Sequence, residues 1–293
     1  MKYIEKQPVI MIVVGVLGIS LSSIFVKYST APSAVTAAYR LLWTVLLMTP
    51  VTFGKKEIRQ ELFQISRHTL MLSCLSGLFL AFHFTLWFES LRHTSVASST
   101  TIVCTEVIWV SLGYALFLKG KLSLKEILTI GVTLFGSVLI AFADSASGGD
   151  HLYGDILSLL AAVAVAIYVL IGRIVRKSTS TTVYTYIVYS SCAVVLLAMC
   201  WMQGDSLWGY GIIGVIVGLL LAVFSTILGH SIFSWCLKYF SPSFVSASKL
   251  CEPVAAAILA GFLFGEIPST MQIAGGALIL GGVLYYSKLE QKG

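Results

Sequence analysis

Residues 8–29 read PVIMIVVGVLGISLSSIFVKYS, a mainly apolar run whose single charge, Lys27, stands near its end. As a helix rising 1.5 Å per residue, about twenty such residues cross the roughly 30 Å hydrocarbon core of a bilayer. Lys2 and Lys6 precede the run, as in a secretory signal, but no clean small-residue cleavage site follows it. We therefore expect a retained transmembrane helix.

Nine further runs of the same kind follow along the chain. They lie near 33–53, 70–90, 95–118, 123–143, 153–172, 181–201, 211–236, 242–264 and 269–287. Of the 293 residues, 57% are hydrophobic and only 11% are charged, which is more apolar side chain than a water-soluble domain of this length can bury. The predicted fold class is all-α integral membrane with ten transmembrane helices.

The placement of Lys and Arg predicts the orientation, because basic residues near span ends are retained in the cytoplasm. With the N-terminus inside, fifteen of the nineteen Lys and Arg residues lie inside, and only Lys27 and Arg92 lie near span ends outside. We expect a protein of the inner (plasma) membrane with both termini cytoplasmic. The net charge of +6 therefore reflects topology, and no dense basic cluster on a soluble unit indicates a nucleic-acid partner.

The chain also matches itself at an offset of 146 residues. The matched pairs are Lys27 with Arg173, Leu91 with Leu237, Arg92 with Lys238, Ser95 with Ser241, Glu106 with Glu252, Ser123 with Ser269, and Gly136 with Gly282. Five spans per half is an odd number, so the second half must enter the membrane from the opposite side. We predict two inverted five-helix repeats, 1–143 and 153–293, joined by a linker at 144–152, with a site near mid-membrane between them.

Glu252-Pro253, followed by Phe264-Gly265-Glu266 and then by Gly275 to Gly282 in the last span, forms a further motif. With it, the chain resembles the drug/metabolite transporter superfamily, in its ten-helix EamA-type branch, over essentially its whole length. The first half carries an eroded copy, with Val107 in place of the proline and Gly120 in place of the second glutamate. The resemblance implies a central cavity lined by the first four helices of each half, with the fifth and tenth helices peripheral.

Two carboxylates stand at matching depth inside the predicted spans. Glu106 lies eleven residues into the fourth span, about 16 Å from its start by helical rise, and Glu252 repeats that depth in the ninth. A charge at this depth is costly unless it is paired or hydrated. Each is expected either to bind a substrate ammonium or titrate, or to serve the structure by capping or pairing. Glu106 has Val103 where Glu252 has Lys249 nearby, so we expect it to lack a local counter-charge.

Two cations share this environment. Lys249 precedes Glu252 by three residues, which places both on one helical face, where they either neutralise each other or leave Lys249 to hold a carboxylate or phosphate. Arg40 lies about seven residues into the second span. We expect Trp43 to cover its guanidinium, and either pairing with a carboxylate such as Glu89 or contact with substrate.

Histidine and aromatic side chains complete the candidate set. His83 and His230 fall one residue out of register in the third and eighth spans, and Trp87 lies one turn after His83. Each is read either as a packing element or as a substrate contact. The remaining candidates are Trp109, which shares a face with Glu106, and Tyr168 and Trp235.

Enzyme motifs are missing from the sequence: we find no phosphate-cradling glycine loop, no metal-spaced histidine pair and no nucleophile elbow. The six cysteines all stand in apolar runs, so we expect no disulfide and no metal cluster. The leading hypothesis is a secondary transporter of small metabolites such as amino acids, without a cofactor, working by alternating access, with export as the expected direction. Proton coupling and plain exchange both stay open. The alternatives are an organic-phosphate or nucleotide-sugar carrier and an integral-membrane enzyme acting on lipid-linked substrates.

Overall fold

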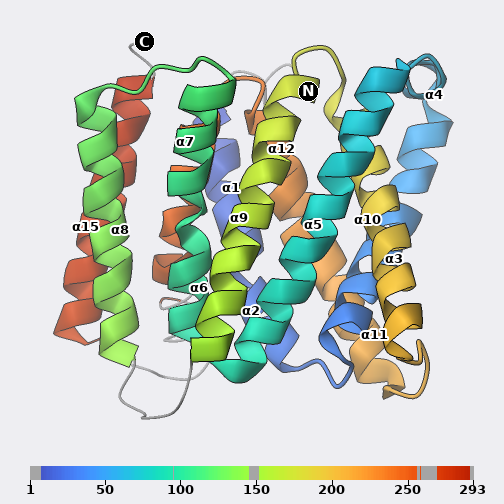
Figure 1. Cartoon of the computed structure of the whole chain (residues 1–293), viewed down its shortest axis with the longest axis horizontal. Coiled ribbons are helices and arrows are strands. Elements are labelled where there is room, and N and C mark those ends of the chain that lie inside the picture. The colour runs from blue at the N-terminus through green and yellow to red at the C-terminus, as the bar shows by residue number, and fades with distance from the viewer. Residues whose placement is uncertain (1–7, 95, 145–151, 256–257, 259–268, 291–293) are drawn as a thin grey trace.

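The computed structural model describes residues 8–94, 96–144, 152–255, 258 and 269–290. Every regular element within these residues is a helix (Figure 1). The helices are α1 (Pro8–Ser20), α2 (Ser22–Lys27), α3 (Ser33–Gly54), α4 (Lys56–Phe63), α5 (Arg67–His93), α6 (Val96–Cys104), α7 (Glu106–Phe117), α8 (Leu124–Asp144), α9 (Leu152–Val175), α10 (Thr181–Gln203), α11 (Gly211–Leu220), η2 (Leu221–His230), α12 (Ser231–Cys236), α13 (Pro242–Ser248), η3 (Lys249–Cys251) and α15 (Thr270–Glu290).

Seven continuous segments are long and apolar enough to cross a membrane. They are Pro8–Lys27, Ser33–Gly54, Arg67–His93, Ser99–Phe117, Leu152–Val175, Thr181–Gln203 and Gly211–Cys236. Each coincides with a predicted span. Helices α8 and α15 coincide with the fifth and tenth predicted spans but are not among the seven. The ninth predicted span, 242–264, is described only in part, and its far end lies outside the described residues.

Serine caps begin several of these helices. Ser66, Ser180 and Ser241 stand just before α5, α10 and α13, and each side-chain oxygen accepts a hydrogen bond from the backbone N–H three residues on. Such a cap satisfies one of the unpaired N–H groups of a first helical turn. In α13 the cap is followed by Pro242, whose missing N–H costs nothing at that position. The polar residues between the apolar runs thus set where the helices begin.

Four of the long helices are irregular near their middle. The first breaks at Leu21 between α1 and α2, and the fourth breaks at Thr105 between α6 and α7. The eighth contains the π-helix η2, and the ninth tightens into the 3-10 helix η3. Irregular backbone at membrane depth is tolerated where it is buried in protein or lines a cavity. These irregular segments therefore indicate where a site lies.

Helices α8 and α15 pack along each other at one edge of the molecule (Figure 1). Glycines permit the close approach: a Cβ added at Gly136 would lie 2.7 Å from the carbonyl oxygen of Gly275, and one added at Gly282 would lie 2.2 Å from Cγ2 of Thr133. Gly136 faces α15 and Gly282 faces α8, and these two glycines are a matched pair in the sequence repeat.

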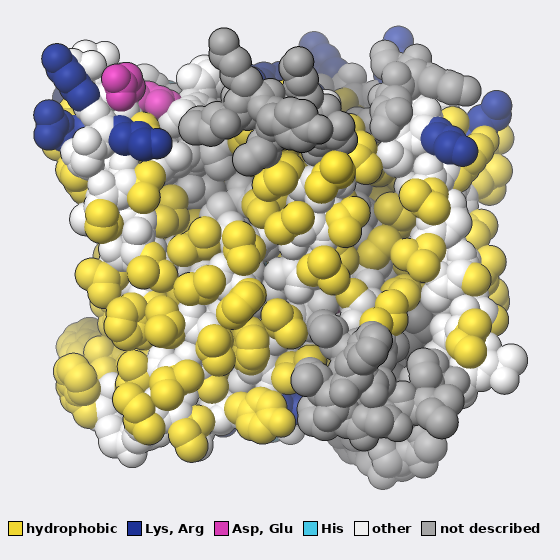
Figure 2. Space-filling model, turned by 180° about the vertical axis from the view of Figure 1, so that it is seen from behind, with side chains coloured by type: hydrophobic (Ala, Val, Ile, Leu, Met, Phe, Trp, Pro, Cys, Tyr) yellow, Lys and Arg dark blue, Asp and Glu magenta, His cyan; other side chains and the backbone are white. Residues whose placement is uncertain are grey.

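The surface is divided into an apolar belt and a charged edge. Figure 2 shows hydrophobic side chains over most of the described face, with Lys and Arg gathered along the upper edge. Large apolar residues such as Leu46, Leu116 and Val194 are 59%, 73% and 65% exposed. In water this exposure would be unfavourable, whereas in a bilayer it meets lipid. The start of α1 and the end of α15 lie at the same upper face (Figure 1).

Candidate functional site

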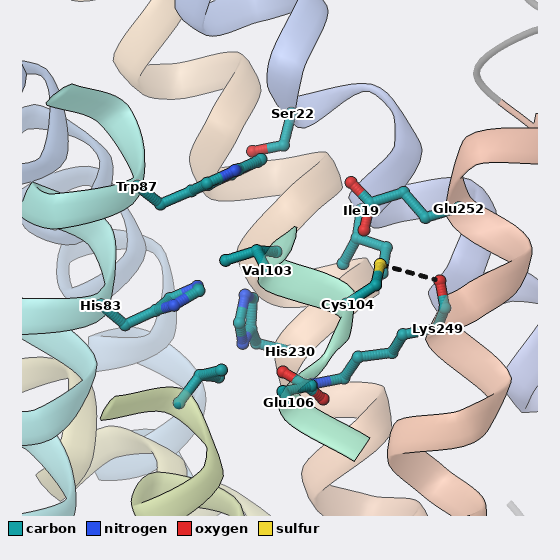
Figure 3. A pocket seen from close by; sticks show the side chains of 11 residues that line it. Ile19, Ser22, His83, Trp87, Val103, Cys104, Glu106, His230, Lys249 and Glu252 are labelled. Carbon is teal, nitrogen blue, oxygen red and sulfur yellow. Dashed lines mark hydrogen bonds and ion pairs between the residues drawn. The ribbon is translucent and has the colours of Figure 1, made fainter. Parts of the chain in front are cut away.

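A cavity of about 40 Å³ lies among the four irregular helices (Figure 3). Its lining residues are Ile19, Ser22, His83, Trp87, Val103, Cys104, Glu106, Val165, His230, Lys249 and Glu252. They come from helices α1, α2, α5, α6, α7, α9, η2 and η3 and from Glu252 directly after η3. This volume holds only a few water-sized molecules. The lining includes six of the ten residues that the sequence proposes.

An ion pair joins the two halves of the chain at this cavity. Lys249 Nζ lies 2.8 Å from Glu106 Oε1, and the two side chains are only 8% and 5% exposed. The prediction that Glu106 lacks a counter-charge is therefore wrong. Pairing of Lys249 with Glu252 is also wrong, because α13 packs against α7 and brings Glu106 within reach of the long lysine side chain. The contact between helices, rather than the three-residue spacing of Lys249 and Glu252, therefore decides the partner of Lys249.

Glu252 is the open carboxylate of the cavity. Its side chain is buried, and among the described residues it makes no hydrogen bond or ion pair. Only its main-chain oxygen is used, since Ser20 Oγ donates to it at 3.5 Å. Val103, which stands where the repeat would place a lysine, lines the cavity with an apolar side chain. The two matched carboxylates thus differ: one is neutralised and the other is free.

Three aromatic rings form one wall of the cavity. The ring centroids of His83 and Trp87 are 6.1 Å apart and nearly parallel, and the ring of His230 lies 6.2 Å from that of His83. His83 Nδ1 lies 3.0 Å from the carbonyl oxygen of Ala161, which can only accept, so Nδ1 carries the proton. Trp87 Nε1 and His230 Nδ1 are buried without a hydrogen-bond partner in the described part of the chain. Buried polar atoms of this kind are rare unless a ligand or water satisfies them.

Arg40 lies behind this wall and is only 1% exposed. Its Nε donates to Thr226 Oγ1 at 2.7 Å, its Nη1 donates to Ser22 Oγ at 3.4 Å, and its guanidinium carbon lies 4.0 Å from the centroid of the Phe84 ring. The cation–π partner is thus Phe84 rather than Trp43. Nη2 has no hydrogen-bond partner among the described residues.

Pairing of Arg40 with Glu89 is not found. The Glu89 carboxylate accepts a hydrogen bond from Ser33 Oγ at 2.7 Å and lies 3.1 Å from His93 Nε2. Arg40 and Glu89 therefore belong to separate polar groups. Ser22, which the sequence reasoning missed, connects Arg40 to the cavity.

Besides Arg40, three candidates do not line the cavity in this conformation. Tyr168 is buried one layer behind it, with its hydroxyl 2.8 Å from Ser234 Oγ and its ring 6.0 Å from that of His230. Trp235 is half-buried and packs on Tyr239, whereas Trp109 is 38% exposed on the outer surface of α7. The sequence reasoning also missed Cys104, Val103, Ile19 and Val165. The sequence repeat contains a signal for Ser22, because Ser22 matches Tyr168, which is among the candidates.

Comparison with known proteins agrees with this architecture. The profile of the EamA-like transporter family matches twice, over residues 6–142 and 152–288. The uncharacterized transporter YwfM of Bacillus subtilis (strain 168) is 26% identical over 220 residues, which are 74% of this chain and 73% of that protein. An uncharacterized transporter of Archaeoglobus fulgidus is 24% identical over 201 residues, 68% of this chain and 69% of its own.

A crystal structure of another protein shares the fold, with a TM-score of 0.78 at 16% identity and 98% of both chains covered. Its likeness concerns the fold alone. The family match spans nearly the whole chain, once in each half, and the helices are apolar enough to cross a membrane. This chain therefore belongs to the EamA-like transporter family of multi-pass membrane proteins.

Proposed function

We propose that the protein is a secondary transporter of small metabolites that carry a protonated amine, with amino acids as the leading class and export as the direction. The observation that carries this proposal is the unpaired Glu252 carboxyl group in the central cavity. A buried carboxylate without a partner is costly in a membrane, and a substrate ammonium would neutralise it. Glu252 is also the group best placed for proton coupling, because Glu106 is occupied by Lys249.

The unpaired nitrogens on the aromatic wall favour a second polar group on the substrate. Trp87 Nε1 can only donate, so it suits an acceptor such as a carboxylate oxygen. His230 Nδ1 can donate in one neutral tautomer. An amino acid offers an ammonium for Glu252 and a carboxylate for these nitrogens. The flat rings of His83 and Trp87 offer an apolar surface for its side chain.

The proposed mechanism is alternating access of two inverted five-helix halves, 1–143 and 153–293, joined by the linker 144–152. In this proposal ten helices cross the inner membrane and both termini are cytoplasmic. Two features support it: the matched glycines Gly136 and Gly282 face each other's helix across α8 and α15, and the halves meet at the Lys249–Glu106 pair beside the cavity. Inverted repeats that place a site between broken helices are a common plan of secondary transporters.

The rival reading is a carrier of organic phosphates or nucleotide sugars. It needs a free cation in the cavity, but the Lys249 ammonium is already paired with Glu106. Arg40 reaches the cavity only through Ser22. The ionisable group that stays unpaired in the cavity is therefore a carboxyl group, which favours an amine over a phosphate.

A thermal-shift screen of the purified protein tests this proposal. Amino acids, polyamines and organic phosphates are compared, because a ligand of the folded state stabilises it by about 2.7 kcal/mol at a hundredfold excess over Kd. We expect a compound with a protonated amine to raise the Tm of the native protein and to lose this effect in Glu252→Gln. The control is Glu57→Gln, which removes an exposed carboxylate from α4. Stabilisation by an organic phosphate that Glu252→Gln retains would contradict the proposal.

A further inference from the structure

A second cavity of about 450 Å³ lies where α2, the turn before α3 and the end of α5 meet. These parts of the chain lie at the face opposite the start of α1 and the end of α15 (Figure 1). Its lining residues are Val26, Lys27, Ser29, Ala31, Ser33, Thr36, Phe88, Leu91 and Arg92. We call it the outer vestibule. It is larger than the central cavity, and its lining is mostly polar.

Two basic residues with an unusual position in this chain, Lys27 and Arg92, line the outer vestibule. Lys27 and Arg92 are the two Lys or Arg residues near span ends on the side where the charge bias leaves almost none. They come from different helices, yet both line this cavity. Their convergence argues that the two exceptions to the charge pattern serve one purpose.

Neither cation forms an ion pair with a carboxylate in the described part of the chain. Arg92 Nη2 donates to the carbonyl oxygen of Ala31 at 2.7 Å, which is a neutral acceptor, and the other guanidinium N–H groups stay available. Lys27 is exposed and makes no hydrogen bond or ion pair with any described residue. The neighbouring carboxylate, Glu89, accepts a hydrogen bond from Ser33 and lies close enough to Arg92 for the two charges to interact. Two cations against one carboxylate leave an excess of positive charge at the vestibule, which Lys27 carries.

The repeat shows that Lys27 differs from its structural counterpart. Arg173, which matches Lys27, donates through Nη1 to the carbonyl oxygens of Leu237 and Phe240 and so holds the turn after α12. Leu91 matches Leu237 and lies beside Lys27 in the vestibule, but no such bond forms there. Arg173 is thus held by backbone carbonyl oxygens, whereas Lys27 has no such acceptor among the described residues and can bind another molecule.

We propose that the outer vestibule binds an anion, either a carboxylate or a phosphate group, between Lys27 and Arg92. The hydroxyls of Ser29 and Thr36 lie 2.6 Å apart in the same lining, and when Thr36 donates to Ser29 the Ser29 hydroxyl can donate to the anion. The group comes either from a soluble metabolite or from the headgroup of an anionic lipid. The inference does not rest on the proposed transport of amines, since the vestibule would hold an anion even if Glu252 met no substrate.

The test measures the charge of the vestibule with a thiol reporter. Val26→Cys is made with Cys74→Ser and Cys251→Ser, which remove an exposed and a half-buried thiol. The protein is placed in phosphatidylcholine nanodiscs at low ionic strength, where charges are least screened. The rates of reaction with an anionic and a cationic methanethiosulfonate reagent are then compared. Ser29→Cys serves as a second reporter if Val26→Cys does not fold.

We expect the anionic reagent to react faster and Lys27→Gln to lower the ratio of the two rates on the order of tenfold, as one unit charge nearby predicts. The matched control, Lys121→Gln, removes an exposed lysine beyond α7 and should leave the ratio unchanged. Protection by inorganic phosphate in phosphatidylcholine alone identifies a soluble anion. Protection by added phosphatidylglycerol without phosphate identifies a lipid. A ratio that Lys27→Gln does not change, or the absence of protection by both, would overturn the proposal.

Discussion

Lys249 and Glu106 form an ion pair across the cavity, with Nζ 2.8 Å from Oε1 and both side chains almost fully buried. The pair links a residue of the second half to a residue of the first. Glu252, which matches Glu106 in the repeat, has no such partner because Val103 stands where a second lysine would be. One side of the pseudo-symmetric site thus holds an ion pair, and the other holds an unpaired carboxyl group.

The ion pair predicts how Glu106 responds to substitution. Glu106→Gln leaves the buried Lys249 ammonium without its counter-charge, and removing one partner of a buried pair typically costs about 3–5 kcal/mol. We expect a clear fall in the apparent melting temperature in detergent. The double variant Glu106→Gln with Lys249→Gln removes both charges and should recover part of the loss. A single variant that melts like the native protein would show that the pair is not stabilising.

A lysine at Val103 should complete the missing pair. Val103 is 7% exposed and lines the cavity with Glu252, so Val103→Lys places an ammonium where the repeat has Lys249. We expect the new lysine to occupy Glu252 and to abolish stabilisation by amine ligands. Val103→Met is the matched control, because it fills similar space without charge and should keep ligand binding. Unchanged amine binding in a folded Val103→Lys protein would contradict the role of Glu252.

The contact between α8 and α15 predicts a difference between neighbouring glycines. A Cβ at Gly282 would lie 2.2 Å from Thr133 Cγ2, whereas a Cβ at Gly281 would meet nothing within 4 Å. Gly282→Ala should therefore lower the free energy of unfolding by an amount typical of overpacking, about 1–3 kcal/mol. This loss is measured as a lower apparent melting temperature. Gly281→Ala in the same helix should be neutral or slightly stabilising. Equal behaviour of the two variants would argue against this helix contact.

The charge bias predicts the topology. Glu57 is exposed in α4, which lies in a loop that we place in the cytoplasm. A cysteine at position 57 should react with a membrane-impermeant maleimide only after the cells are opened. Labelling of this position in intact cells would show that the orientation is inverted.

Most of the helical architecture follows from local properties of the sequence. Hydropathy and basic residues are read along a single chain, so segments such as 67–93 and 181–203 are predicted within a few residues. The breaks are different: the break at Leu21 and the π-helix that ends at His230 depend on neighbouring helices and have no local signal. The repeat predicted which residues lie at equal depth but not which of them touch.

The sequence predicts many of the residues that line the site, but not which of them form contacts with each other. His83, Trp87 and Glu252 were identified because polar and aromatic residues at mid-membrane are rare, and they do line one cavity. The partner of Lys249 was missed because Glu106 is distant in sequence and reaches it only through packing of α13 on α7. Phe84 was missed as the cover of Arg40 for the same reason.

Substrate flux tests the central claim, that Glu252 receives the amine of the substrate, most directly. The ligand that the thermal-shift screen identifies is measured as a radiolabelled flux in liposomes containing the native protein, Glu252→Gln, or Glu106→Gln with Lys249→Gln. We predict that Glu252→Gln keeps its melting temperature but loses flux, because the free carboxylate is not needed for folding. The double variant should keep a measurable part of the flux despite lower stability. Native flux in Glu252→Gln together with none in a folded double variant would contradict the account and move the substrate contact to the Lys249–Glu106 pair.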